Sequence, residues 1–151
     1  MRKLFLTLGY SGLSPKAPGT VGSFVALILG MLLLQVLPLS TLFLLSLLIS
    51  VFAVKQIDIY EKEVGVHDGK EIVIDELAGM WITMGVAGVT ATSWTIAIIA
   101  FLFFRLFDIW KPSIIGKIDE KVAGGWGVMG DDMVAGVFAG LCTSLVYFLI
   151  F

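Results

Sequence analysis

Long apolar stretches alternate with short charged segments along this chain. Five apolar stretches stand out, at residues 21–37, 41–54, 72–89, 94–107 and 133–151. A helix needs about 20 residues to cross a bilayer, with a range of roughly 17–25. The second and fourth stretches are short by that rule, so we expect each to continue as helix into the charged segment that follows it. Lipid cannot satisfy open backbone groups, and the pattern therefore predicts helices rather than open strands.

The charged residues gather in three segments. All ten Lys and Arg and all twelve Asp and Glu lie within residues 2–16, 55–76 and 105–132, and the links at 38–40 and 88–93 carry no charge. With five crossings, the three charged segments share one side of the membrane. Because Lys and Arg mark the cytoplasmic side, the sequence predicts an all-α, polytopic membrane bundle of about five apolar helices with charged cytoplasmic loops.

The composition agrees with a membrane protein. Apolar residues make up 58% of the 151 residues and charged residues only 15%, whereas soluble domains are usually about 45–50% apolar. The length favours a single domain over residues 1–151, and a net charge of −2 argues against a nucleic-acid partner. The single cysteine, Cys142, can form no internal disulfide. The short, Gly- and Pro-interrupted start is expected to belong to the mature protein rather than to a signal peptide.

The N-terminal arm could bind an anion. Residues 12–20 lead into the first apolar stretch, and Thr20 is a plausible N-cap of its helix. Free backbone N–H groups at a helix start bind anions, and Lys16 would add a positive charge. The alternative is a capped turn that simply enters the membrane.

The segment before the third apolar stretch contains several ionisable groups. His67 is the single histidine, and an isolated His in a polar loop is often just solvated. Asp75 and Glu76 stand at the entrance to an apolar helix, where ionisable residues are costly and usually functional. Adjacent helix positions point about 100° apart, so one acid could bind a metal while the other orients a neighbour. The alternative is favourable acid placement in a first turn.

A third group recurs every three residues. Arg105, Asp108 and Lys111 would lie along one side of a helix before Pro112. Two cations and an acid on one stripe could hold a phosphate and a metal together. A network of interfacial ions on snorkelling side chains is the competing interpretation.

A glycine-rich stretch at 124–130 precedes a pair of acids, Asp131 and Asp132. A cap at the start of the last helix explains one of them but not both. Paired carboxylates suit Mg²⁺, and the absence of a His/Cys cluster argues against zinc.

Three acidic positions thus fall at the cytoplasmic ends of three predicted helices. Helices that end at the same depth would bring Asp75/Glu76, Asp108 and Asp131/Asp132 into one pocket. Crowded carboxylates repel each other unless they bind a cation or take up protons. Positively charged side chains that could bind the phosphate oxygens in this pocket are those of Lys16, Arg105 and Lys111.

These segments resemble the phosphatidylglycerophosphatase A family. The matching runs occur in family order: GLSPKAPGTVGS (12–23), VHD (66–68), IDELAGMW (74–81), FRLFDIWKP (104–112) and GGWGVMGDDMVAG (124–136). The resemblance implies a Mg²⁺-dependent phosphatase of the bacterial inner membrane, with its active site facing the cytoplasm. Its substrate would be a phospholipid in the bilayer, and water would convert phosphatidylglycerophosphate to phosphatidylglycerol and phosphate.

Roles can be assigned to the candidate residues as hypotheses. Asp75, Glu76, Asp131 and Asp132 would hold one or two Mg²⁺, which polarises a phosphoryl oxygen and makes a bound water more acidic. Asp108 would be the base for that water or a further ligand. Asp75 is a catalytic candidate as well as a metal ligand. Phosphate would be bound by Lys16, Arg105, Lys111 and the amides around Thr20. His67 could protonate the leaving glycerol oxygen, and a phosphoenzyme through an aspartate stays an alternative.

Two other functions compete with this hypothesis. An ion-coupled transporter would place acids near mid-bilayer and charge on both faces. A non-catalytic membrane adaptor would need no convergence of acids. The number of metal ions and a homo-oligomeric state are left open by the sequence.

Overall fold

The computed structural model describes residues 5–9, 18–65, 72–90, 92–110 and 124–150. Within these ranges the chain forms helices and no strand, which confirms the all-α prediction. The helices are α2 (Pro18–Leu33), α3 (Leu39–Val64), α4 (Ile74–Ala87), α5 (Trp94–Trp110) and α7 (Gly124–Ile150).

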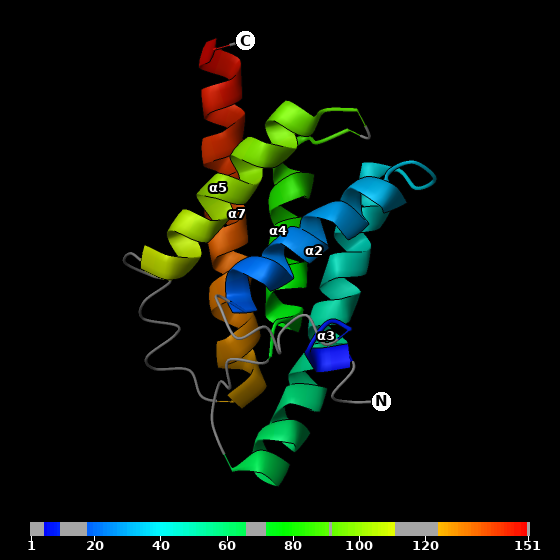
Figure 1. Cartoon of the computed structure of the whole chain (residues 1–151), viewed down its shortest axis with the longest axis vertical. Coiled ribbons are helices and arrows are strands. Elements are labelled where there is room, and N and C mark those ends of the chain that lie inside the picture. Colours follow the sequence, from blue (N-terminus) through cyan, green and yellow to red (C-terminus); the bar gives the residue numbers. More distant parts are fainter. Residues whose placement is uncertain (1–4, 10–17, 66–71, 91, 111–123, 151) are drawn as a thin grey trace.

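Helix α4 is the centre of the bundle (Figure 1), and α2, α3, α5 and α7 all pack against it. Every residue from Ile74 to Met84 is buried. A helix that is covered on all sides must bury whatever its sequence carries. The two acids of its first turn, Asp75 and Glu76, therefore lie inside the protein.

Glycines allow α4 and α7 to approach closely. A Cβ added to Gly136 would lie 2.5 Å from the carbonyl oxygen of Gly79. The hydroxyl of Thr83 bridges the same crossing, 2.9 Å from the Gly79 oxygen and 3.1 Å from the Gly136 oxygen. A Cβ on Gly140 would likewise meet Val86. Small residues at positions 136 and 140 thus let the two helices pack closely.

The helix ends differ from the sequence pattern in informative ways. As expected, α3 and α5 continue past their apolar stretches, to Val64 and Trp110. Helix α7, however, begins at Gly124, so Asp131 and Asp132 lie within the helix and the cap interpretation for them is wrong. Helix α2 begins at Pro18, which suits a first helical position because proline has no N–H to leave unpaired. Thr20 is thus a first-turn residue and not the N-cap.

Two helices are long and apolar enough to cross a membrane, Leu39–Glu63 within α3 and Met129–Ile150 within α7. Both present exposed apolar side chains, among them Leu44, Leu48, Leu145 and Phe148. Contiguous apolar surface of this kind fits contact with lipid. Five crossings stay a prediction, because α2, α4 and α5 are shorter.

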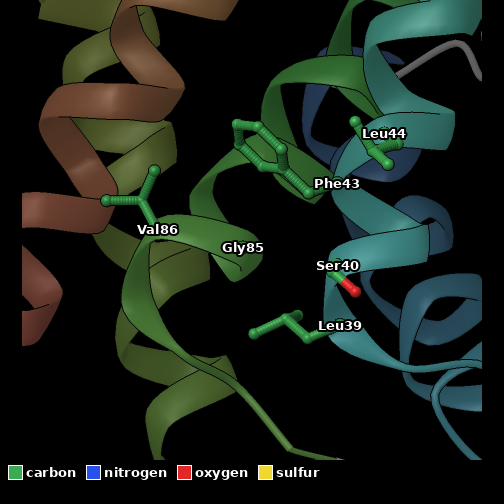
Figure 2. Close-up of a pocket in the computed structure, with 6 residues that line it drawn as sticks. All are labelled: Leu39, Ser40, Phe43, Leu44, Gly85 and Val86. Atoms are coloured by element: carbon green, nitrogen blue, oxygen red, sulfur yellow. The ribbon is translucent and has the colours of Figure 1, made fainter.

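An apolar cavity of about 500 Å³ lies between the first turns of α3 and the last turn of α4 (Figure 2). Its walls include Leu39, Phe43, Gly85 and Val86. A Cβ on Gly85 would lie 2.5 Å from the Phe43 ring, so the missing side chain makes room for that ring. The cavity lies at the end of α4 opposite to Asp75 and Glu76 and is lined by no ionisable side chain among the described residues.

Candidate metal centre

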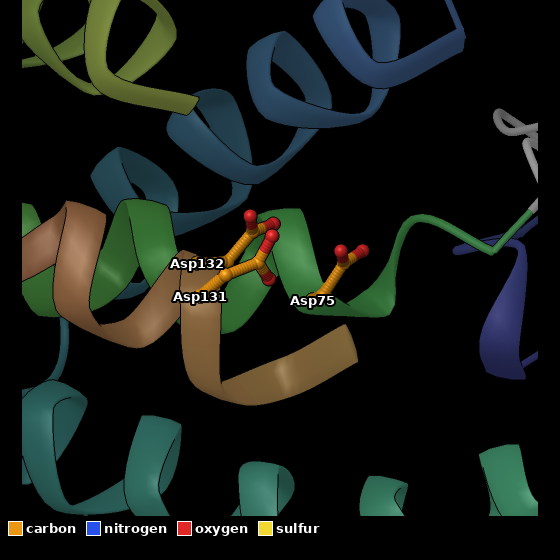
Figure 3. A group of neighbouring side chains, drawn as sticks. All are labelled: Asp75, Asp131 and Asp132. Atoms are coloured by element: carbon orange, nitrogen blue, oxygen red, sulfur yellow. The ribbon is translucent and has the colours of Figure 1, made fainter. Parts of the chain in front are cut away.

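Three buried aspartates meet where the first turn of α4 passes α7 (Figure 3). One carboxylate oxygen from each of Asp75, Asp131 and Asp132 lies within 4.8 Å of those from the other two. The crossing of Gly79 and Gly136 fixes this arrangement, because each glycine lies one helical turn beyond its aspartate. The expected meeting of the α4 and α7 acids is therefore observed.

A second acidic group adjoins the first. Carboxylate oxygens of Glu76, Asp108 and Asp132 also lie within 4.8 Å of one another. Asp132 belongs to both groups, and α5 supplies Asp108. Asp75 and Glu76 join different groups, as the angle of about 100° between successive helix positions predicts.

Arg105 is a counter-ion of the second group. Its Nη1 donates to Asp108 Oδ2 at 2.5 Å and to Glu76 Oε2 at 3.2 Å. All three side chains are largely shielded from solvent, and the screening that weakens exposed ion pairs is correspondingly reduced. The predicted Arg105–Asp108 stripe is thus present, and it contacts the acids rather than pointing to open water.

Ser23 is a site residue that the sequence reasoning missed. Its hydroxyl is fully buried, 3.1 Å from Glu76 Oε2 and 2.8 Å from the Gly19 carbonyl oxygen. It also accepts a hydrogen bond of 3.4 Å from Arg105 Nη1. One signal could have found it: a small polar residue one helical turn after Gly19, inside an otherwise apolar run.

The start of α2 closes over this second group. A Cβ on Gly19 would lie 3.1 Å from Glu76 Oε1 and 3.4 Å from both terminal nitrogens of Arg105. Thr20 lies in the same turn, whose backbone N–H groups have no partner within the helix. Such a turn favours anions, and here it lies beside a guanidinium group. His67, Lys16 and Lys111 lie outside the described residues.

Burial of these acids calls for compensation. The exposed fraction is 7% for Asp75 and Glu76, 4% for Asp131 and 1% for Asp132. Oδ2 of Asp132 is buried and has no hydrogen-bond partner within the described ranges. A buried carboxylate oxygen without a partner costs free energy. A divalent cation would remove that cost, and a donor set made only of carboxylate oxygens suits a hard ion such as Mg²⁺. The residues present therefore fit a divalent metal.

Comparisons with known proteins agree with this site. The model of the phosphatidylglycerophosphatase A family matches residues 4–147. The chain is 40% identical to phosphatidylglycerophosphatase A of Escherichia coli, over 95% of this chain and 81% of that protein. It is 38% identical to the Haemophilus influenzae protein of the same name, over 89% of this chain and 82% of the other.

A third relative carries a different name. A Bacteroides thetaiotaomicron protein, provisionally named a phosphatidylinositol-3-phosphatase, is 35% identical over 85% of this chain and 82% of its own length. No solved structure matches the chain.

Proposed function

The chain belongs to the phosphatidylglycerophosphatase A family and is a phosphatase, and we propose that it hydrolyses phosphatidylglycerophosphate to phosphatidylglycerol and phosphate. In this proposal the reaction uses Mg²⁺ and takes place at the cytoplasmic face of a bacterial inner membrane. The observation that carries the proposal is the meeting of five carboxylates from three helices around Asp132, beside Arg105 and the start of α2.

The residues divide into a metal side and a phosphate side. On the metal side, Asp75, Asp131 and Asp132 provide ligands and Glu76 supports them. The cation, when bound, supplies positive charge for a phosphoryl oxygen and makes a water molecule a better nucleophile. This division follows from the two directions in which Asp75 and Glu76 point.

On the phosphate side, Arg105 and the first turn of α2 face the same region. Nε of Arg105 is buried and has no hydrogen-bond partner among the described residues, so it is available to a phosphate oxygen. Guanidinium groups and helix N-termini are preferred partners of phosphate. Thr20 belongs to this turn, and we assign Lys16 and Lys111 to the same task.

Proton transfer is assigned to Asp108 and His67. Asp108 lies at the edge of the acid cluster with one oxygen paired to Arg105, which orients its carboxylate. We propose that Asp108 either takes the proton of the attacking water or serves as a further metal ligand, and that His67 returns a proton to the leaving glycerol oxygen.

The proposed membrane arrangement has five crossings with the site at the cytoplasmic boundary. Exposed tryptophans support it: Trp110 ends α5 near the acids, Trp126 lies in the first turn of α7, and Trp94 begins α5 at the other end. Tryptophan is enriched at membrane–water interfaces. A site at that depth reaches a lipid phosphate while the acyl chains stay in the bilayer.

The two competing functions are less well supported. A non-catalytic adaptor gives no reason for acids remote in sequence to share one buried site. An ion-coupled transporter predicts acids in the middle of the apolar helices, whereas Asp75 and Glu76 stand in the first turn of α4.

The test is phosphate release by the purified protein from phosphatidylglycerophosphate in mixed micelles. We expect activity with Mg²⁺, loss on chelation and recovery when Mg²⁺ is returned. Asp75→Asn and Asp131→Asn should each lower kcat/KM by at least about 100-fold. Glu63→Gln, an acid at the exposed end of α3, is the matched control and should stay active. Full activity in both aspartate variants would exclude this site.

A lipid panel tests the substrate separately. Phosphatidylglycerophosphate, phosphatidic acid and phosphatidylinositol 3-phosphate differ in what surrounds the same phosphate group. We expect the first to be hydrolysed fastest. Faster hydrolysis of the inositol lipid would overturn the substrate assignment but would not contradict the proposed metal site.

A further inference from the structure

We propose that the acid cluster holds two divalent cations side by side, with Asp132 as a ligand shared by both. This inference depends on one part of the proposed function, namely that the acid cluster binds metal. The two acidic groups, Asp75/Asp131/Asp132 and Glu76/Asp108/Asp132, provide three carboxylates for each cation.

The geometry favours two positions over one. A single cation bound by one group would leave the acids of the other group without a divalent counter-ion, because Asp75 and Glu76 are successive residues of a helix and serve different groups. Asp132 is the residue common to both sets. A carboxylate has two oxygens and can bind a cation with each, so Asp132 suits a bridging position.

Asp132 carries a second, independent sign of a ligand. It is the most buried of these five acids, with an exposed fraction of 1%, and its Oδ2 has no hydrogen-bond partner in the part of the chain that the structure describes. Its carboxylate lies toward those of Asp131 and Asp75 (Figure 3). An unpaired carboxylate oxygen at that depth is costly unless something positive binds it.

Charge balance points the same way. Five ionised acids carry five negative charges, of which Arg105 offsets one within the described residues. One divalent cation would leave two negative charges facing a phosphate group that itself carries about −1.5 to −2. A second cation brings this set to neutrality. Paired cations about 3.5–4 Å apart stabilise both the attacking and the leaving oxygen in phosphoryl transfer.

The two positions are not equivalent. Arg105 already donates to Glu76 and Asp108, so a cation at that position competes with a guanidinium group. Among the described residues, the ion pairs of Arg105 are with these two acids and do not include Asp75 or Asp131. We therefore expect the guanidinium group to make the Glu76/Asp108/Asp132 position the weaker of the two cation sites.

Mn²⁺ is the probe, bound to the full chain in detergent and followed by equilibrium dialysis and electron paramagnetic resonance. We expect two Mn²⁺ per chain at saturation, with spectra that show magnetic coupling between them. Asp75→Asn should weaken the tight site and Asp108→Asn the weak site, each by about tenfold or more. Each variant should lose the coupling while one cation still binds.

Arg105→Gln gives a result that a merely structural role would not produce. It removes the competing positive charge, so the weaker Mn²⁺ site should tighten although phosphatase activity falls. Glu63→Gln is the control and should keep two coupled ions.

The outcomes separate this inference from the proposed function. One uncoupled Mn²⁺ per chain in an active enzyme would overturn the shared-ligand centre and leave a one-metal phosphatase standing. Failure to bind Mn²⁺ together with Mg²⁺-independent activity would overturn both. Asp132→Asn removes the shared ligand and should weaken both Mn²⁺ sites. If this variant fails to fold, Asp75→Asn and Asp108→Asn still decide the question, because each removes an unshared ligand.

Discussion

Arg105 connects the two parts of the site that we propose bind metal and phosphate. Its Nη1 contacts Glu76, Asp108 and the hydroxyl of Ser23, and its Nε stays buried without a partner among the described residues. A guanidinium group has five N–H donors in a planar fork, whereas a lysine ammonium is a compact point charge. A change to lysine therefore keeps the charge and loses the geometry.

The first prediction follows from that difference. Arg105→Lys should lower kcat/KM about 10- to 100-fold, the effect of losing one hydrogen bond to a charged group. Steady-state phosphate release from micellar substrate measures it, and Lys62→Arg on exposed α3 surface is the control. Equal activity of Arg105→Lys and the wild type would mean that only the charge matters at this position.

Ser23 provides a second prediction at the residue scale. Ser23→Ala removes the hydroxyl between Glu76 and Arg105 and should lower kcat/KM about tenfold. It should also shift the Mg²⁺ concentration needed for half-maximal activity, because Glu76 loses an orienting partner.

Ser46→Ala is the matched control for Ser23→Ala. Ser46 is as buried as Ser23 and lies on α3, where its hydroxyl donates to the carbonyl oxygen of Phe43. Among the described residues, this hydroxyl makes no hydrogen bond with the acids of the candidate site. An unchanged Mg²⁺ dependence in Ser23→Ala would remove the positioning role. Recovery of activity in Ser23→Thr, which restores a hydroxyl, would support it.

The charged residues that the structure brings together could be predicted from sequence, whereas Ser23 carries only a weak sequence signal. An acid or arginine beside an apolar helix is costly, so its presence is itself a signal. A serine in such a helix commonly bonds to the carbonyl four residues earlier and needs no other reason to be there. Ser23 does make that bond, to Gly19. Only the fold reveals its second contact, with Glu76.

At the scale of elements, the crossing of α4 and α7 sets the geometry of the site. The two backbones touch at Gly79 and Gly136, one turn beyond Asp75 and Asp132. Contact between backbones leaves no flexible side chain that could move aside. The distance between the two aspartates therefore depends on residues that carry no chemistry themselves.

The third prediction tests this dependence. Gly136→Ala adds a Cβ at 2.5 Å from the Gly79 oxygen and should destabilise the protein by about 1–3 kcal/mol. It should also weaken Mn²⁺ binding, because separated helices hold Asp75 and Asp132 farther apart. Thermal unfolding in detergent and Mn²⁺ dialysis measure the two effects. Val137→Ala, at the neighbouring exposed position, should change neither.

Helix boundaries were the least predictable elements. Four glycines within residues 124–130 read as a loop, because glycine is a poor helix former. In the structure this stretch is helical, and Gly127 and Met129 within it are buried. Tertiary packing outweighs local propensity there. The central, fully covered position of α4 was likewise not visible in its sequence, since apolar periodicity does not say how many neighbours a helix has.

At the scale of the whole molecule, the distribution of charged residues along the chain is the basis of the predicted membrane topology. The three charged segments and the charge-free links predict two faces for the chain, and the parts of α4, α5 and α7 that bear the acids do lie together. Helices α2 and α5 run obliquely across the bundle (Figure 1). Hydropathy alone cannot tell an oblique crossing from a helix resting at the interface, so α3 offers the clearest measurement.

The last prediction concerns the orientation of α3. Its ends are marked by Ser40 and Lys62, both exposed, and the helix between these two residues spans about 33 Å. In a Cys142→Ser background, Ser40→Cys should react in intact cells with a thiol reagent that cannot pass the inner membrane. Lys62→Cys should react only after the membrane is opened, because it shares the cytoplasmic side with the acids. Equal labelling of both positions in intact cells would mean that α3 does not cross the bilayer, and a reversed pattern would put the acids on the outer side. Either result would contradict the proposed cytoplasmic location of the site. The proposed metal centre is tested separately, by the Mn²⁺ binding measurements.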